Sequence, residues 1–269
     1  MKKTKTLNPD KFVVKSNDLV EARYRLSLQE SHLVLWLLTQ IRHEDEDFKT
    51  HQLRVEDFAN MAGLRIDAQY DELKKTTLRL MQRVMQIYDP EKNETIQVSW
   101  LSLAKYHHKT GYVSLRFDPA LRPYLIQLKS HFTKIDITDT MKFKSIYAVR
   151  IFELLSQYSS IGKREFTIDD LRSYCGIKKT EYELYAGLKR YVLNRAKTEI
   201  NAKTDYEVDY KEIKDSRKVV STDWTFKKKT HFEKAQSEKT AILAKELRST
   251  YAILEQLLEY GFTKQAANR

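Results

Sequence analysis

The sequence predicts an α+β protein, mainly helical, in which one structural unit occurs twice in tandem. Three observations support this fold class: few Gly and Pro residues, a repeated set of motifs, and helical patterns followed by alternating ones. The 269 residues include only 6 Gly and 4 Pro, so turns are few and helix is the favoured regular structure. The length fits one large or two ordinary globular domains.

The repeat consists of three pairs of similar motifs that occur in the same order. Each second motif follows its counterpart roughly 115 residues later. The pairs are Leu37-Leu38-Thr39-Gln40 with Leu154-Leu155-Ser156-Gln157, the run 55–64 with the run 168–177, and Tyr70, Leu73 and Lys74 with Tyr185, Leu188 and Lys189. Three matches in register indicate two copies of one unit.

The first copy begins with an apolar helix expected over residues 28–41. Ser27 is its N-cap, and Glu30 three residues later completes a capping box. A short helix over 55–61 stops at Gly63, and a longer helix over 67–87 follows. Two alternating segments, 96–106 and 112–117, then predict a β-hairpin.

The second copy repeats this order. Helices are expected over 142–158, 168–174 and 182–201, the middle one ending at Gly176, and a hairpin pairs 206–213 with 218–226. Three helices followed by a hairpin is the order of a winged helix-turn-helix module. We therefore divide the chain into an N-terminal winged-helix domain (1–139), a C-terminal winged-helix domain (140–230) and a helical tail (231–269).

In such modules the second helix of the pair enters the major groove of DNA, so one face packs on the core and the other carries donors. At 100° per residue, the second copy turns Leu188, Val192, Ala196 and Ile200 inward, together with Tyr185. The opposite, DNA-facing side holds Glu183, Gly187, Arg190, Asn194, Lys197 and Asn201, with Lys189 nearer the apolar edge. Arg and Asn are the side chains best shaped for guanine and adenine edges.

The same placement on the first copy groups an apolar face and a polar face. The inward residues are Tyr70, Leu73, Thr77, Leu80, Val84 and Ile87, and the outward candidates for DNA contact are Lys75, Arg79, Gln82 and Gln86. For both helices the alternative is an ordinary solvated face without a ligand.

Basic residues in the hairpin turns predict contacts with phosphates. In the second hairpin they are Lys211, Lys214, Arg217 and Lys218, followed by three lysines at 227–229; in the first they are Lys105, His107, His108 and Lys109. The formal net charge is +11, and residues 140–230 hold 20 basic and 13 acidic side chains, most of that excess. This field attracts polyanions such as nucleic acid or anionic lipid.

Several classes of protein are excluded. No apolar run approaches the roughly 18 residues of a membrane span, the basic start lacks the apolar stretch of a signal peptide, and the single Cys175 forms no internal disulfide, so we expect a cytoplasmic protein. Gly162-Lys163-Arg164 does not complete a phosphate loop, and the adjacent His107 and His108 do not form a metal pair on a strand. We expect no catalytic residue, no metal and no cofactor.

Several runs are similar to one known family. They include Asn17-Asp18-Leu19-Val20-Glu21-Ala22, Pro123-Tyr124-Leu125-Ile126-Gln127-Leu128 and, most specifically, Ser145, Tyr147, Arg150 and Glu153-Leu154-Leu155 at their family spacing. Over residues 17–226 the chain resembles the iteron-binding plasmid replication initiator (Rep) proteins of theta-replicating bacterial plasmids. The tail beyond residue 230 is not covered by any of these motifs.

The resemblance implies two winged-helix domains that bind directly repeated origin sequences (iterons) in double-stranded DNA as a monomer, open the origin and recruit the host helicase and host initiator. It also implies a homodimer, joined through the first domain, that represses its own gene. The helix around residues 183–194 would give most of the sequence specificity.

Two alternatives share much of this pattern. A winged-helix transcription regulator has the same fold without a replication role, and an origin-nicking enzyme would cleave single-stranded DNA with a metal. Leu19, Leu26 and Leu33 keep a heptad spacing, but the polar run 17–25 favours core packing over a zipper.

Overall fold

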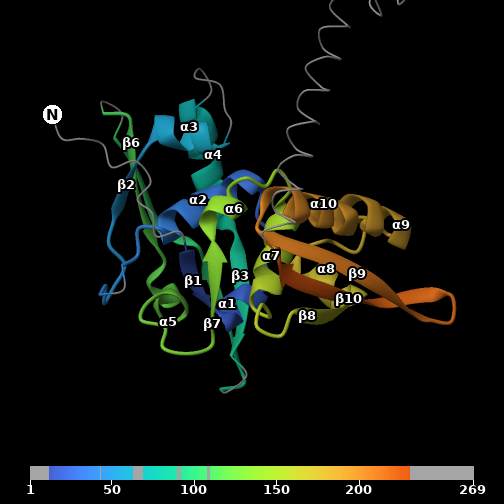
Figure 1. Cartoon of the computed structure of the whole chain (residues 1–269). Helices are drawn as coiled ribbons and strands as arrows, with labels where there is room; N and C mark the ends of the chain where they lie inside the picture. The colour runs from blue at the N-terminus through green and yellow to red at the C-terminus, as the bar shows by residue number, and fades with distance from the viewer. Residues whose placement is uncertain (1–11, 43, 63–68, 90–91, 108–109, 231–269) are drawn as a thin grey trace, which may run out of the picture.

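Two lobes of helices and strands lie on either side of helix α7 (Ile146–Ser156) in the computed structural model of the chain (Figure 1). The structure describes residues 12–42, 44–62, 69–89, 92–107 and 110–230. Helix α7 packs against strand β7 (Phe132–Asp136) of the first lobe and helix α10 (Asn194–Lys203) of the second. The predicted helical tail lies outside the described residues, as do Gly63, His108 and Lys109.

The first lobe contains the helix and hairpin order predicted for the first copy. Its helices are α1 (Asn17–Glu21), α2 (Leu28–Leu38), α3 (Val55–Ala62), α4 (Gln69–Gln82), η2 (Pro119–Leu121), α5 (Arg122–Leu125) and α6 (Ile137–Thr140). Its strands are β1 (Phe12–Ser16), β2 (His51–Arg54), β3 (Val84–Asp89), β4 (Glu94–Ser99), β5 (Leu101–His107), β6 (Tyr112–Phe117) and β7. Antiparallel pairing joins β1 with β7, β3 with β4, and β2, β6 and β5 in that order.

The predicted capping box at the start of α2 is confirmed. The Ser27 hydroxyl accepts from the Glu30 backbone N–H, and the Glu30 carboxylate accepts from the Ser27 N–H at 2.7 Å. Two of the otherwise unpaired donors at the helix start are satisfied in this way.

The predicted long helix of the first copy extends too far. Helix α4 ends at Gln82, and the residues predicted to continue it form strand β3. Val84 and Gln86 are exposed there while Met85 and Ile87 are buried, which is the two-residue period of a strand. Antiparallel pairing with β4 supplies the backbone hydrogen bonds that favour the strand.

The segment 96–106 was predicted as one strand and is two. Trp100, fully buried, separates β4, which pairs with β3, from β5, which pairs with β6. Its ring packs edge-to-face against Tyr24, with 5.3 Å between ring centroids. The β5–β6 hairpin itself is confirmed.

The second lobe follows its predicted order closely. Its elements after α7 are β8 (Lys163–Thr167), α8 (Ile168–Tyr174), α9 (Tyr185–Leu188), the π-helical segment η3 (Lys189–Leu193), α10, β9 (Tyr206–Asp215) and β10 (Lys218–Lys228). Helix α8 has the predicted bounds, whereas the long helix begins at Tyr185, three residues later than predicted. The unpredicted strand β8 joins the hairpin in a sheet of order β8–β10–β9.

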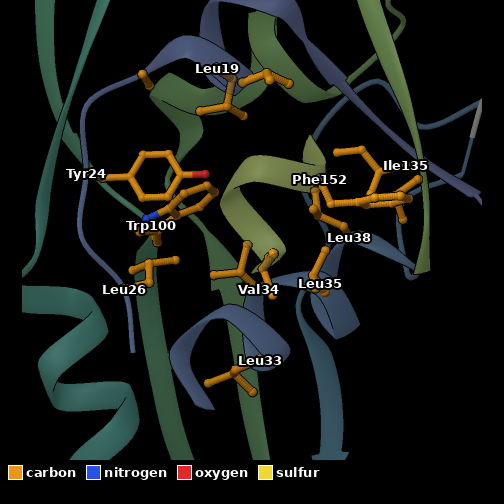
Figure 2. Packing of buried hydrophobic residues seen from close by; sticks show 14 of the residues in the cluster. Leu19, Tyr24, Leu26, Leu33, Val34, Leu35, Leu38, Trp100, Ile135 and Phe152 are labelled. Atoms are coloured by element: carbon orange, nitrogen blue, oxygen red, sulfur yellow. The ribbon is translucent and has the colours of Figure 1, made fainter. Parts of the chain in front are cut away.

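Buried apolar side chains from both lobes form one contiguous core. Figure 2 shows Leu19, Leu26 and Leu33 within this core, with Tyr24 beside Trp100 and Phe152 of α7 beside Ile135 of β7. The three leucines are buried, so core packing is confirmed as the reason for their heptad spacing.

A buried ionic cluster joins the lobes at α7. The Glu153 carboxylate accepts from Lys15 Nζ of β1 at 2.7 Å and from Arg150 at 2.8 Å, and Arg150 also donates to the Tyr24 hydroxyl at 2.6 Å. Burial opposes the ionisation of Glu153, but the two cations override it and hold the pKa of this carboxyl below its ordinary value. The pairing satisfies charges that would be very costly alone.

Candidate nucleic-acid interface

Helix α8 and the long helix after it form the helix-turn-helix pair of the second lobe. Arg172 of α8 holds the turn between them: its guanidinium donates to the backbone carbonyls of Lys178 at 2.8 Å and Tyr182 at 3.1 Å, and also to that of Glu181. A guanidinium carries five donors in a rigid fork, so one side chain fixes several peptide groups at once. The start of the long helix is therefore anchored.

The first lobe also contacts this turn. Arg25 makes a two-bond ion pair with Glu181, with N–O distances of 2.7 and 2.8 Å. Gly176 has φ +62°, and a Cβ built there would lie 2.7 Å from the Arg25 Cβ and 2.8 Å from the Tyr24 carbonyl oxygen. Only glycine fits this position, because it needs both the left-handed backbone and the close approach.

The long helix runs without a break through α9, η3 and α10, from residue 185 to residue 203, and we call it the recognition helix. Its predicted inward face is confirmed, because Leu188, Val192, Ala196 and Ile200 are all fully buried. Arg190 and Asn194, predicted to face DNA, are exposed.

A second face of the recognition helix lies along strand β9. Tyr185 donates to Glu212 at 3.0 Å, Lys189 pairs with Glu212 at 2.7 Å, and Tyr210 donates to Asn194 at 2.7 Å. Further along, Lys197 pairs with Asp209 at 2.6 Å, and the Asn201 amide bonds the backbone of Val208.

The spacing of these contacts reveals a change in helix phase. They occur at residues 185, 189, 194, 197 and 201, and the five-residue step falls across the π-helical segment. A π segment inserts one extra residue and rotates everything after it, which a constant 100° step does not anticipate. Asn201 is thereby turned to the base of the hairpin and away from the predicted DNA-facing side.

Two lysines of the recognition helix are paired with carboxylates of strand β9. The hydrogen bond from Lys189 holds the pKa of the Glu212 carboxyl below its ordinary value, and the bond from Lys197 does the same for Asp209. Both carboxylates stay ionised at neutral pH, so each cancels much of the charge of its lysine. Lys189 and Lys197 thus act first in fixing the helix to the β9–β10 hairpin, which we call the wing.

The other predicted cations of this lobe are exposed. Within the described part of the chain, no carboxylate pairs with the recognition-helix residue Arg190 or with the wing residues Lys211, Lys214, Arg217 and Lys218. Arg190 lies over the ring of Tyr191, 5.3 Å from its centroid. Together with Asn194 these five cations form what we call the helix–wing surface.

A hollow of about 480 Å³ opens between the recognition helix and the wing. Its lining comes from both elements, with three residues of the helix and five of the wing: Lys189, Asn194, Lys197, Asp209, Tyr210, Lys211, Glu212 and Lys214. The Tyr210 hydroxyl fixes the orientation of the Asn194 amide, whose donor group is then preset for a ligand. Charge, hydrogen-bond donors and a concave form coincide here.

In the first lobe, carboxylates of the same lobe pair with the arginine of the long helix that was predicted to contact DNA. Lys75 and Gln82 are exposed, as predicted, but Arg79 is engaged with Glu72 at 3.0 Å and Glu30 at 3.5 Å. Glu30 is fully buried and also accepts from Arg83 at 2.7 Å. Of the predicted hairpin residues, Lys105 is exposed and His107 bonds to Ser114 at 2.8 Å.

The structure thus brings together most of the predicted residues of the second lobe. Glu183 is exposed in the turn before the helix, and Gly187 is partly covered beside Tyr182, so these two lie at the start of the recognition helix. Sequence reasoning missed Arg172, Asp209, Tyr210 and Glu212. The last three lie close together on strand β9, but nothing in the sequence shows which side chains of this strand meet the helix.

The described residues contain no helix long and apolar enough to cross a membrane. Among them there is also no group of three or more His, Cys, Asp or Glu side chains that would hold a metal ion. Burial raises the pKa of the Cys175 thiol to about 12, which leaves it protonated and unreactive.

Two helix-turn-helix pairs, each followed by a hairpin, define a tandem winged-helix protein. The family described as initiator replication protein, WH1, matches residues 12–156, and the one described as initiator Rep protein, WH2, matches residues 167–226. These matches span most of the chain, so it belongs to the family of two-domain replication initiator proteins.

Relatives of the chain occur in Escherichia coli. It is 27% identical over 227 residues to an uncharacterized 27.6 kDa protein, covering 80% of this chain and 94% of that one. It is 25% identical over 198 residues to a replication initiation protein, covering 70% of this chain and 61% of that one, and 24% identical over 222 residues to the PI protein, covering 70% and 73%.

Among solved structures, the Pi initiator protein in complex with iteron DNA has a similar fold. The TM-score is 0.66 at 21% sequence identity, and the match covers 81% of this chain and 98% of that one. The expected α+β fold with two winged-helix domains is therefore confirmed.

Proposed function

We propose that the chain is a plasmid replication initiator that binds repeated sequences, or iterons, in double-stranded DNA at its origin. The observation that carries this proposal is the helix–wing surface, where Arg190 and four wing cations lie exposed beside Asn194. Binding of phosphates requires cations, and recognition of base edges requires hydrogen-bond donors that are held in place. The helix–wing surface has both. The family and the iteron complex of the Pi initiator protein support the choice of DNA.

The two domains would divide the work. We assign the main sequence-specific DNA binding to residues 140–230. Its DNA-contacting residues on the helix side would be Glu183, Gly187, Lys189, Arg190, Asn194 and Lys197, and the wing residues Lys211, Lys214, Arg217 and Lys218 would contact phosphates. Residues 1–139 would supply further DNA contacts through Lys75, Arg79 and Gln82, and the homodimer interface. The unequal charge supports this division, since residues 140–230 hold 20 basic against 13 acidic side chains.

The proposed activity is binding and not catalysis. Opening of the origin would follow from several chains bound to neighbouring repeats, and host replicative helicase and host initiator would join them in the cytoplasm. A dimer of the same chain would bind near its own gene and repress it. None of these steps uses a catalytic residue, a metal or a cofactor.

Footprinting on the DNA that flanks the gene tests the proposal. We expect protection of several direct repeats of about two helical turns, beside an A·T-rich segment, with binding that weakens steeply as salt increases. Protection of one operator without repeats would favour the transcription regulator. Cleavage of single-stranded DNA in magnesium or manganese would contradict a non-enzymatic initiator.

A further inference from the structure

Leu184 is an unusually exposed apolar side chain. It lies one residue before the recognition helix, and 78% of its surface is open to solvent, the largest value among the exposed large apolar side chains that the structure describes. Its backbone is fixed, because its carbonyl accepts the first helical bonds from Gly187 N at 3.0 Å and Leu188 N at 3.3 Å. A rigid backbone thus presents a leucine side chain to water.

The Leu184 side chain does not stabilise the start of the recognition helix. It occupies the N-cap of the recognition helix and makes no side-chain cap hydrogen bond. The corresponding caps of α2 and α8 are Ser27 and Thr167, and both accept from the backbone three residues later. A leucine at an N-cap provides no such hydrogen bond. An exposed leucine also gains no stabilisation from the burial of its apolar surface.

The position of Leu184 indicates what would cover it. The first residues of the second helix in a helix-turn-helix pair meet the base edges of the major groove. Tyr185, the next residue, bonds to Glu212 of the wing, so this end of the helix lies beside the helix–wing surface. Arg172 holds the carbonyls of Glu181 and Tyr182 just before it, which sets the direction in which the chain enters the helix.

We infer that Leu184 is a specificity-determining residue that contacts the C5-methyl group of a thymine in the major groove. This inference rests on the proposed function. The thymine methyl is the one apolar group that the base pairs present in that groove, and its contact with an apolar side chain distinguishes thymine from the other bases. Arg190 and Asn194 would read polar edges, and Leu184 adds the apolar position that they lack.

Replacement of thymine by deoxyuridine tests the contact, because it removes only the methyl group. Duplexes are first selected from a random-sequence pool by the full chain, and each thymine of the selected duplex is then replaced singly. We expect at least one position where the substitution weakens wild-type binding about fourfold, the effect of one methyl-sized group, as measured by fluorescence anisotropy.

The variant Leu184→Ser separates recognition from folding. It restores a preferred N-cap, so Tm should rise by about 2–4 °C. It should bind the thymine duplex about fourfold more weakly than the wild type and no longer distinguish thymine from deoxyuridine at that position. A more stable protein that discriminates less well cannot be explained by damage to the fold.

Ile161→Ser is the matched control. Ile161 is 62% exposed, in the turn that leads to β8, and its loss should leave the sensitivity to deoxyuridine unchanged. Failure of the wild type to select any sequence would overturn the proposed function itself. Selection of a sequence with no thymine position that depends on Leu184 would overturn only the role of Leu184, as would a loss of self-association in Leu184→Ser with an unchanged thymine preference.

Discussion

In the first lobe an arginine of the long helix and the one just after that helix bind the protein's own carboxylates, whereas in the second lobe an arginine of the long helix is left to solvent. Arg79 and Arg83 pair with the buried Glu30, while Arg190 has only the ring of Tyr191 beneath it. The order of elements is the same in both lobes. Where the carboxylates lie therefore decides whether a basic helix stabilises its own domain or is available to a ligand.

The carboxylates of the wing likewise pair with some cations and leave others exposed. In the second lobe, Asp209 and Glu212 engage two lysines of the recognition helix and leave the wing cations exposed. Pairing within this surface has a structural result, because it fixes the helix against the wing. The exposed cations then sit on a rigid support, which reduces the entropy lost when DNA binds.

The largest expected effect is a loss of stability when the ionic cluster between the lobes is broken. Glu153→Ala removes the carboxylate shared by Lys15 and Arg150 and leaves two buried cations without it. The free energy of unfolding, measured by urea denaturation, should fall by about 3–5 kcal/mol. Glu207→Ala, on the exposed side of β9, should stay within about 0.5 kcal/mol of the wild type. A small effect of Glu153→Ala would mean that the lobes do not depend on this cluster.

Asn194→Ala and Gln82→Ala compare the two long helices directly. Asn194 is held by Tyr210 beside the hollow, and its loss should reduce discrimination between matched and mismatched base pairs by about 1–3 kcal/mol. Loss of the Gln82 side chain, at the end of α4, should reduce this discrimination by a smaller amount. Competition binding with single-base variants of the protected repeat measures both. Equal losses would show that the lobes share sequence recognition evenly.

Acid should destabilise the protein through histidines of the first lobe. Burial lowers the pKa of His32 in α2 and of His51 in β2, whereas residues 140–230 contain no histidine. A histidine whose folded pKa is depressed takes up a proton on unfolding, so stability is lost as pH falls below about 6.5, its unfolded value. Urea midpoints at pH 7.5 and 5.5 should therefore differ, and less so in His32→Leu. Replacement of the exposed His131 by Gln serves as the control.

The smallest effect concerns a single wing cation. Lys214→Ala should weaken binding to all sequences alike and reduce the slope of log K against log salt by about 0.9, the value of one phosphate contact. Lys197→Ala should change the slope less, because Lys197 is paired with Asp209. A larger change of the slope for Lys197→Ala than for Lys214→Ala would contradict the assignment of Lys214 as a DNA-contacting cation and of Lys197 as a structural one.

Local patterns predicted those features that depend on neighbours in the chain. The capping box of Ser27 and Glu30, helix α8 and the buried stripe ending at Ile200 all follow from local spacing, and all are confirmed. Strand β3 and the π segment did not follow from it. The first depends on pairing with β4, and the second changes the helical period itself.

The candidate site shows the same limit. The residue types Arg190 and Asn194 were found from the sequence, because groove-reading side chains on a polar helix face are recognisable without contacts. Which lysines are free was not predictable. That distinction depends on Glu212 and Asp209, which reach the helix only after the wing folds back along it.

The most direct test compares Arg190→Ala on two duplexes, the protected repeat and a random sequence of the same length, at one salt concentration. If the recognition helix of the second lobe reads bases, the variant should lose about 1–3 kcal/mol of binding on the repeat and much less on the random duplex. Equal losses on both would show that Arg190 contacts only phosphate, and would contradict sequence recognition by this helix.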